Sequence, residues 1–437
     1  MRFAEDLGEV THPSKFRRVA RKPCDDLRQE ASRMNPLHLS GWGCEIQAAH
    51  TRAHAELMIT DGRRDNCNGE RYLFPPRQCP HDSIIVEAKT GHISLTALRW
   101  LSANNLPVFI MNYDGSIISS ILPPQPVKAD VRIAQIKTAS DPKKSLTIAK
   151  ALFQAKITRS LQILDWLAEA YDIEAELQAT KHEAMSFNEG TTVPRLRTVE
   201  GRVALRYWQA FRKVLPLELN FQGRGYDGRN RNATDPFNAA LNYGYGFLQC
   251  ECRKAVNSVG LESSIGFSHT TTEWQTKESL VLDLEEPFRW LVDLCVIQAF
   301  QDSALNVSDF AWDRDDYRYR IETEGRRRFL SILRETFNSG IRYGGQVLKW
   351  DTVIEEKANE LGRFLTGRSS TLDFCEPAPV LTRSDNKVTR ERILSLSQSE
   401  AEKLGIGKST LHYLREKARE HSSFKLYEPV KRKLLKG

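Results

Sequence analysis

Long hydrophobic runs, paired cysteines and an apolar leader are all missing from this sequence of 437 residues. No stretch of eighteen apolar residues occurs, so no transmembrane helix is predicted. The chain opens Met-Arg-Phe-Ala-Glu-Asp and lacks the apolar stretch of a secretory signal. The eight cysteines include no Cys-x-x-Cys pair, and no histidines accompany them at zinc-finger spacing. We therefore expect a cytoplasmic protein with reduced thiols and no membrane partner.

The length and the charge of the chain limit the number of domains and the kinds of partner that are expected. A chain of 437 residues is too long for one ordinary hydrophobic core, so two or three domains are expected. The formal net charge of +7 permits a nucleic-acid partner without requiring one. Residues 391–437 contain eleven Lys and Arg residues and six Glu residues, which gives this tail a net charge of +5. Such a concentration favours contact with DNA phosphates there.

The N-terminal part reads as a basic extension followed by strands. Residues 1–36 are polar and rich in Arg and Lys, without clear periodicity. Residues 37–126 carry short β-like runs that end on turn residues. Within them Ser94 is placed to cap a short helix, and Tyr113-Asp114-Gly115 is a hairpin signal. The expected strands are 37–41, 55–59, 83–86, 107–111 and 116–118.

The middle of the chain, residues 127–366, changes to a helical period and predicts a large all-α domain. A glycine-rich charged stretch, residues 223–232, interrupts this pattern and predicts a loop. The expected helices are 149–177, 200–214, 236–259, 287–300, 326–337 and 351–365.

The sequence of the C-terminal part predicts a linker followed by a DNA-binding unit. Residues 367–386 are rich in Ser, Pro and charge and read as the linker. In residues 387–437 a short helix ends at Gly405, Ile406 fills the turn, and a second helix opens at Lys408. This is the pattern of a helix-turn-helix. The fold class expected is therefore α+β multidomain: a small β-rich domain, a large helical domain and a C-terminal helix-turn-helix.

Three stretches of the helical domain offer ligands for a hard metal ion. They contain Glu200, His269, and the pair Asp283 and Glu286. Each alone has an ordinary structural explanation: Glu200 as the cap of a helix N-terminus, His269 as a loop histidine, and the pair as a capping box. Two carboxylates and an imidazole together would suit Mg²⁺ or Mn²⁺.

In this order and with these neighbours, the stretches resemble the CRISPR-associated adaptation integrase and its transposon-encoded relative, the casposase. The matching motifs are Glu-Gly-x-x-Ala-x-x-Tyr from Glu200, Gly-Leu-x-x-x-Ile-Gly-Phe before His269, and Asp-Leu-x-Glu-Pro-Phe-Arg around Glu286. The resemblance extends from about residue 37 to residue 365. It implies that Glu200, His269 and Glu286 are catalytic metal ligands, with Asp283 as the alternate ligand because it lies on the same helix face as Glu286.

The resemblance also implies a prokaryotic, metal-dependent DNA integrase with endonuclease activity that joins donor 3′-OH ends to target DNA. Because two ends join two strands, a dimer or a tetramer on DNA is expected. The residues expected to contact DNA are Asn238, Arg202, Arg206, Arg289, Arg224, Arg229, Arg231, Lys408, Ser409, Thr410 and Arg415. For each arginine a solvated charged surface is an equal alternative.

The basic extension and the helix-turn-helix favour a casposase, which acts without a partner. One alternative is a CRISPR adaptation integrase that works with a small partner subunit. Another is a non-catalytic helix-turn-helix DNA-binding protein with an integrase-like body. A third is a zinc protein that uses Cys67, Cys79 and His81, or Cys250 and Cys252, although their irregular spacing favours free thiols.

Overall fold

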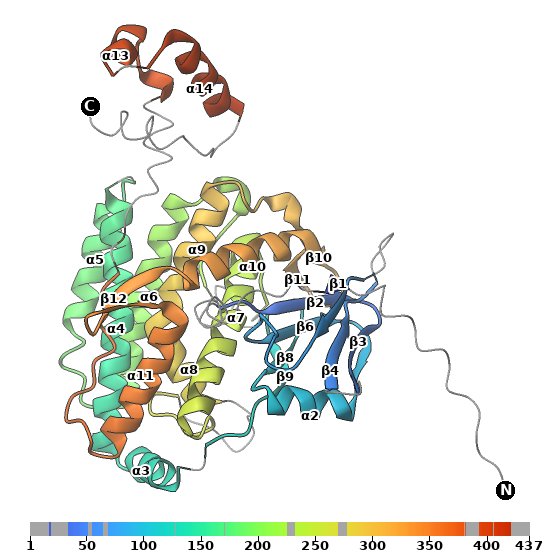
Figure 1. Ribbon diagram of the computed structural model, residues 1–437. Coiled ribbons are helices and arrows are strands. Elements are labelled where there is room, and N and C mark those ends of the chain that lie inside the picture. The colour runs from blue at the N-terminus through green and yellow to red at the C-terminus, as the bar shows by residue number, and fades with distance from the viewer. Residues whose placement is uncertain are drawn as a thin grey trace, which may run out of the picture.

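The computed structural model describes residues 17–18, 34–50, 55–63, 69–126, 128–169, 171–224, 232–269, 278–379, 381, 393–404 and 406–420. Strands fill the N-terminal part and helices form the bulk of the rest (Figure 1), which confirms the expected mixed α+β fold. The strands are β1 Arg17–Arg18, β2 Leu37–Gly41, β3 Cys44–His50, β4 Ala55–Thr60, β5 Arg71–Phe74, β6 Ile84–Ala88, β7 Gly91–Ile93, β8 Val108–Met111, β9 Ile117–Ile121, β10 Phe310–Asp313, β11 Arg318–Ile321, β12 Gly340–Tyr343 and β13 Gln346–Lys349. The helices are α2 Leu95–Ala103, α3 Ala129–Ala139, α4 Pro142–Ala168, α5 Glu174–Met185, α6 Val193–Val214, α7 Pro236–Val259, α8 Ser279–Glu285, the 3₁₀ turn η3 Glu286–Phe288, α9 Arg289–Gln301, α10 Thr323–Phe337, α11 Trp350–Leu365, α13 Gln398–Lys403 and α14 Lys408–Glu420.

The N-terminal region contains two sheets, in the orders β1-β5-β4-β3-β7 and β2-β6-β8-β9. In the second sheet β2, β6 and β8 run parallel, and β9 returns antiparallel to β8 as the hairpin signal predicted. Ser94 caps α2, because its side chain accepts a hydrogen bond from the Ala97 N–H at 3.1 Å. The expected short helix and hairpin are both confirmed.

The second sheet is buried on both faces. Successive side chains of a strand point to opposite sides, so Ile84 and Val108 join the core shared with the first sheet. Ile85 and Phe109 instead join the core of the helical body. This sheet therefore connects the β-rich region with the helices, and its continuous apolar strands have the composition expected of a doubly covered parallel sheet.

Helix α7 is the central support of the helical body, and most of its side chains are buried. The β8–β9 turn approaches it closely at Gly115, which has a φ of +86°. A Cβ at Gly246 would lie 1.8 Å from the Gly115 carbonyl oxygen, so only a glycine permits this contact. The docking of the β-rich region thus depends on glycines on both sides of the interface.

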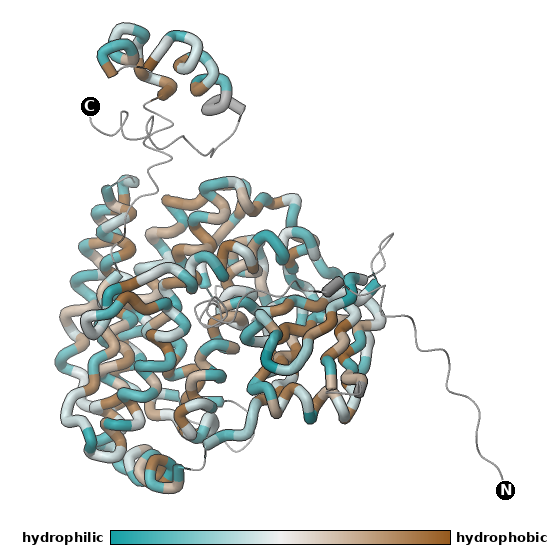
Figure 2. Tube along the Cα trace, in the orientation of Figure 1, coloured by the Kyte–Doolittle hydropathy of each residue, from teal (hydrophilic) through white to brown (hydrophobic). Residues whose placement is uncertain are grey.

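The helices of the body alternate hydrophobic and hydrophilic segments along their length (Figure 2), as expected of elements with one buried and one solvated face. The boundaries of α7 agree with the predicted 236–259. The single helix predicted at 149–177 is wrong, because α4 begins earlier at Pro142, where Asp141 caps it, and ends at Ala168 before α5. Predicting a start at Glu200 was also wrong, because Thr192 caps α6 and Pro194 occupies its first turn.

Two hairpins interrupt the helical body and were not predicted. β10 pairs with β11 and β12 pairs with β13, both antiparallel. Each strand has only four residues, which is too short for a clear alternating pattern. The expectation of an all-α domain from 127 to 366 is therefore wrong in this part of the chain.

The C-terminal part of the described chain contains α13 and α14 (Figure 1). Ser397 and Glu400 form a capping box at the start of α13. The two helices share a small core in which Ile406 is 3% exposed. The core residues are Ile393, Leu396, Ala401, Ile406, Leu411 and Leu414.

Membrane-spanning helices are not found among the described residues, where no helix combines the length and the hydrophobicity that a bilayer requires.

A buried charge cluster joins the β-rich region to the helices. Glu87 on β6 is 1% exposed and lies 2.9 Å from both His38 Nε2 and Arg326 Nε. The Tyr243 hydroxyl of α7 donates a hydrogen bond to the same carboxylate. Burial alone would raise the pKa of Glu87, but His38, Arg326 and the Tyr243 hydroxyl together lower it.

We expect Glu87→Gln to destabilise the protein by about 3–5 kcal/mol, because Arg326 would be left buried without its counter-ion. The lowered pKa means that wild-type Glu87 contributes fully above its unfolded value, 4.5, and loses this contribution as the pH falls through the folded value. Urea unfolding at pH 7 and at lower pH should show a smaller loss of stability on acidification in the variant. Glu324→Gln, at an exposed carboxylate of α10, is the control. Equal pH dependence in Glu87→Gln and wild type would contradict the assignment.

Candidate active site

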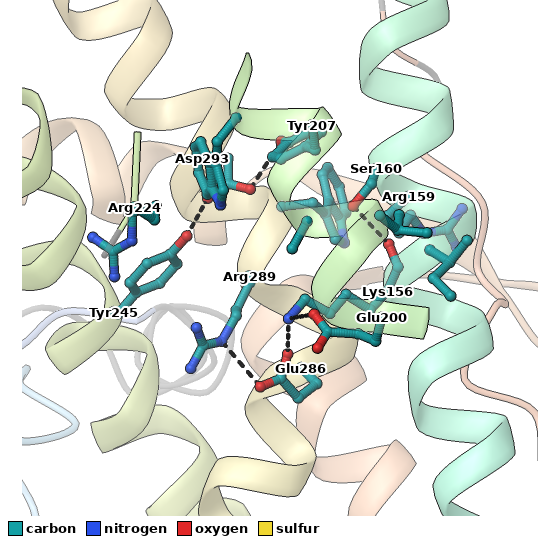
Figure 3. A pocket seen from close by; sticks show the side chains of 15 residues that line it. Lys156, Arg159, Ser160, Glu200, Tyr207, Arg224, Tyr245, Glu286, Arg289 and Asp293 are labelled. Atoms are coloured by element: carbon teal, nitrogen blue, oxygen red, sulfur yellow. Dashed lines mark hydrogen bonds and ion pairs between the residues drawn. The ribbon is translucent and has the colours of Figure 1, made fainter. Parts of the chain in front are cut away.

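A cavity of about 210 Å³ lies where α4, α6, α7 and the α8–α9 junction meet (Figure 3). It contains acidic, basic and aromatic side chains from segments far apart in the sequence. Its lining residues are Lys156, Ile157, Arg159, Ser160, Glu200, Val203, Ala204, Tyr207, Trp208, Arg224, Tyr245, Glu286, Arg289, Trp290 and Asp293.

Two of the predicted carboxylates meet in this cavity on a shared lysine. Lys156 Nζ of α4 lies 2.5 Å from Glu200 Oε1 and 2.7 Å from Glu286 Oε2. The side chain of Glu286 is 5% exposed, that of Glu200 16% and that of Lys156 20%. A single ammonium group therefore neutralises much of the repulsion between two poorly hydrated carboxylates.

Asp283 lies inside α8 and is fully buried, so it is not the N-cap that a capping box requires. Its Oδ2 accepts hydrogen bonds from the N–H groups of Phe267 and Ser268, at 2.5 and 3.0 Å. Its Oδ1 accepts from the N–H of His269 at 2.9 Å and from the Ser268 hydroxyl at 2.5 Å. The hydrogen bonds to the Asp283 carboxylate therefore hold the segment 267–269 against α8.

The same Asp283 orients the imidazole of His269. Oδ1 lies 2.7 Å from His269 Nδ1, and since a carboxylate only accepts, Nδ1 carries the proton. In the neutral tautomer with the proton on Nδ1, the other ring nitrogen, Nε2, would have a free lone pair. Nε2 lies 3.9 Å from Glu286 Oε1. The structure thus brings Glu200, His269 and Glu286 together and turns Asp283 away from the cavity toward the backbone.

The local charges favour ionised Glu286. Burial alone would raise its pKa, but Arg289, Lys156 and His269 together lower it well below the usual value. The pKa of Lys156 is raised, because the attraction of Glu286 and Glu200 outweighs burial. Burial raises the pKa of the neighbouring Glu285 to about 7, against the opposing charge of Arg289. Glu286 and Lys156 are therefore both charged at neutral pH.

Two arginines flank one tyrosine on the opposite wall of the cavity. The guanidinium carbons of Arg224 and Arg289 lie 5.2 and 4.8 Å from the centre of the Tyr245 ring. The Tyr245 hydroxyl donates to Asp293 at 2.5 Å, and the Tyr207 hydroxyl donates to the same carboxylate at 2.9 Å. Figure 3 shows this row of side chains beside the carboxylate pair.

Asn238 supports Arg224 of this wall through a hydrogen bond. Its Oδ1 accepts a hydrogen bond from Arg224 at 3.2 Å, and its side-chain amide donates to the Gly223 carbonyl at 3.0 Å and to Asp235 at 2.6 Å. Asn242 also accepts from Arg224, at 2.8 Å. The start of the glycine-rich stretch is therefore tied to the first turns of α7.

The other predicted DNA-contacting arginines lie elsewhere. Arg202 and Arg206 pair with Glu183 of α5, at 3.0 and 3.8 Å, and do not line the cavity. Arg229 and Arg231 lie outside the described residues.

At the C-terminus, Arg415 donates a hydrogen bond to the Leu396 carbonyl. Lys408, Ser409 and Thr410 are exposed on the first turn of α14.

Several residues at the site were missed by sequence reasoning. Lys156 was overlooked because it sits in an apolar helical pattern and its partners are distant in sequence. Tyr245 and Asp293 lie on buried helices, where polar side chains beside apolar neighbours were the available signal. Arg197 donates to the Ser268 carbonyl and supports the His269 segment, although nothing in its local sequence indicates this.

The donors present fit a divalent metal ion, although they do not enclose one as they stand. Among the described residues, no group of three His, Cys, Asp or Glu side chains is close enough to hold a metal. The reason at this site is that the Lys156 ammonium occupies the position between the carboxylates of Glu200 and Glu286. That a cation rests there shows that the position suits positive charge, and two carboxylates with one imidazole suit Mg²⁺ or Mn²⁺.

The cysteines considered for zinc are free thiols where they are described. Cys250 and Cys252 are buried on α7, and Cys79 is free. Burial raises the pKa of the Cys79 thiol to about 12, which opposes thiolate formation. Cys67 lies outside the described residues.

Comparison with known proteins gives a family match. The family model described as "CRISPR associated protein Cas1" matches residues 57–335. The chain is 31% identical over 293 residues to a CRISPR-associated endonuclease Cas1 of Archaeoglobus fulgidus, covering 63% of this chain and 84% of that protein. It is 30% identical over 349 residues to a Cas1 endonuclease of Thermus thermophilus, covering 77% of this chain and 98% of that protein.

Solved structures agree with this match. A casposase bound to integration product is similar with a TM-score of 0.72 and 34% identity, covering 83% of this chain and 99% of that chain. A Cas1 protein from Thermotoga maritima shares the fold, with a TM-score of 0.61 and 15% identity over 76% of this chain and 97% of that chain.

We expect Asp283→Ala to destabilise the protein by about 2–4 kcal/mol, because it leaves several buried donors without an acceptor. Amide hydrogen exchange at residues 267–269 should accelerate more than exchange at the centre of α7. Asp165→Ala is the control, since Asp165 is half exposed and pairs only with Lys181 at the surface. Unchanged exchange at 267–269 in Asp283→Ala would show that other contacts hold the segment.

Proposed function

Because the chain belongs to the CRISPR-associated Cas1 family and is similar to a casposase over most of its length, we propose that it is a metal-dependent DNA integrase of the casposase type. The 3′-OH of a donor DNA end attacks a target phosphodiester, a new P–O bond forms, and the target strand leaves as a 3′-OH. The observation that carries the proposal is that Glu200 and Glu286 line one cavity and that His269, from a third segment, lies 3.9 Å from Glu286.

In this proposal Glu200, Glu286 and Nε2 of His269 hold Mg²⁺ or Mn²⁺. When bound there, the ion would supply Lewis-acid chemistry: it would polarise the scissile phosphate and stabilise the charge that develops on the attacking and leaving oxygens.

Asp283 positions His269 rather than binding the metal. Its oxygens already accept five hydrogen bonds from residues 267–269, and it is fully buried. Metal-binding histidines commonly donate their second ring N–H to such a carboxylate, which fixes the tautomer and the ring orientation. This supports Glu286 as the third ligand.

Arg224 and Arg289 are the proposed phosphate contacts within the cavity. Both guanidinium groups lie beside the Tyr245 ring, within reach of an anion that enters next to Glu286. Asn238 acts indirectly by orienting Arg224. Arg202 and Arg206 are proposed only as surface cations, because Glu183 pairs with both.

The C-terminal helices α13 and α14 are proposed as a helix-turn-helix that binds duplex DNA. Their small shared core leaves Lys408, Ser409 and Thr410 exposed at the start of α14, where a recognition helix presents its N-terminal residues. Arg415 would contribute mainly by fastening α14 to Leu396.

Concerted joining of two donor ends requires two active sites, so we propose a homodimer or tetramer on DNA. The second candidate function is CRISPR spacer integration with a small partner subunit, which the many similar CRISPR-associated proteins favour.

We expect the purified chain to join a labelled oligonucleotide with a free 3′-OH to plasmid DNA in Mn²⁺ or Mg²⁺. Glu200→Ala, His269→Ala and Glu286→Ala should each lose at least about a hundredfold in rate, because each removes a proposed metal ligand. Asp165→Ala, at a half-exposed carboxylate of α4 that does not line the cavity, is the matched control. Products from wild type and control alone support the autonomous integrase.

Other outcomes of this assay decide between the alternatives. Joining that appears only after a small partner subunit is added would favour the CRISPR function. Equal activity in all three ligand variants would refute the assigned site. No joining under either condition would favour a non-catalytic DNA-binding role.

We expect Lys408→Ala to weaken duplex binding and to reduce the slope of log affinity against log salt by about one, because one phosphate contact is lost. Fluorescence anisotropy at several salt concentrations measures both quantities. Lys181→Ala removes the same charge from α5 and should leave the slope unchanged. If the two variants behave alike, α14 does not provide a phosphate contact.

A further inference from the structure

Lys156 stands out because it occupies the place where the proposed metal ligands meet. It reaches the cavity from α4, and its ammonium group contacts Glu200 at 2.5 Å and Glu286 at 2.7 Å (Figure 3). It therefore pairs with both of the carboxylates that are proposed to hold the metal. Its contacts are therefore informative about how the site changes state.

The lysine and a divalent ion compete for the same atoms. An ion held by Glu200 and Glu286 takes up the carboxylate oxygens that Lys156 now contacts, so the ammonium group must withdraw. Lysine is suited to such a move, since its charge sits on a flexible four-carbon stem. The withdrawn group stays in a cavity that also contains the cations Arg159 and Arg289, so an anion that enters the cavity would be a favourable partner for it.

A DNA phosphate is the anion that the proposed reaction brings into this cavity. We propose that Lys156 is an exchangeable counter-ion that couples metal binding to DNA binding. It neutralises Glu200 and Glu286 in the metal-free protein and pairs with a DNA phosphate when a divalent ion takes its place. The proposal rests on the proposed function, because it assumes that these carboxylates bind the metal.

Thermodynamic linkage gives the proposal a measurable form. DNA that captures Lys156 frees the carboxylates, so DNA must tighten metal binding, and the metal must tighten DNA binding by the same factor. Removing the lysine charge should weaken this coupling and relieve the competition in the absence of DNA. If the role of Lys156 were purely structural, its replacement would instead weaken metal binding.

The test measures Mn²⁺ binding to the full chain from the electron paramagnetic resonance signal of free Mn²⁺, with and without a blunt DNA duplex. In Lys156→Met we expect Mn²⁺ without DNA to bind about tenfold tighter than in wild type, and we expect DNA to tighten it by a smaller factor than in wild type. Lys143→Met is the matched control, because Lys143 is exposed on the first turn of α4, about 20 Å along the helix axis. It should behave as wild type.

Thermal unfolding gives a second readout that does not depend on activity. Lys156→Met should unfold at a lower temperature than wild type in EDTA, because Glu200 and Glu286 repel each other, and Mn²⁺ should restore its stability. Lys156→Gln keeps hydrogen-bond donors without the charge and should show the same tighter Mn²⁺ binding if the Met variant does not fold.

Two results would overturn the proposal: Mn²⁺ binding in both lysine variants no tighter than in wild type, or an undiminished effect of DNA. Failure of the proposed function gives a different result. Glu200→Gln and Glu286→Gln would then bind Mn²⁺ as tightly as wild type, which would show that the metal does not bind at this cavity at all.

Discussion

Glu200 and Glu286 lie on different helices and share one ammonium group in a place that water barely reaches. The apolar residues beside them bring this about, because Ala149, Phe153 and Ile157 of α4 pack against Val199 and Val203 of α6. Lys156 precedes Ile157 on α4, and Glu200 follows Val199 on α6. The packing of these two apolar residues therefore brings the lysine and the carboxylate into contact. Without a cation between them the carboxylates would repel each other at a distance where little solvent screens the charge. The close approach of Glu200 and Glu286 in this cavity therefore depends on a positive charge between them.

The remaining parts of the site are held by contacts that converge on α7 and α8. Asp283 of α8 fixes the segment that carries His269, while α7 supplies Tyr245 and, through Asn238, holds Arg224. On its other side α7 meets the β8–β9 turn at Gly246 and the Glu87 cluster at Tyr243. The β-rich region thus contacts the same helix that carries Tyr245 and Asn238.

The sequence predicted well those features that local patterns encode. The strand from Leu37, the cap at Ser94 and the whole of α7 follow from alternation, capping residues and period. The start of α6 was misplaced because the cap at Thr192 was not recognised, which also made Glu200 look like a terminal residue rather than one within the helix. The four-residue strands β10–β13 carry too few positions for a period to show. Lys156 was invisible for another reason: its meaning depends on Glu200 and Glu286, 44 and 130 positions away.

The arginines of the cavity differ from those of the surface in their partners. Arg289 pairs with the buried carboxylates Glu285 and Glu286, at 3.4 and 3.5 Å. Arg202 and Arg206 are committed to Glu183 at the surface, where such pairs contribute little and are screened by salt. Arg224 instead contacts two asparagine oxygens and an aromatic ring, none of which cancels its charge. Asp293 accepts a hydrogen bond from the hydroxyl of that ring, which orients Tyr245 between the two guanidinium groups. In the proposed function, cations beside two carboxylates would discriminate by position: a phosphate would be attracted at Tyr245, and a divalent ion would be attracted at Glu286.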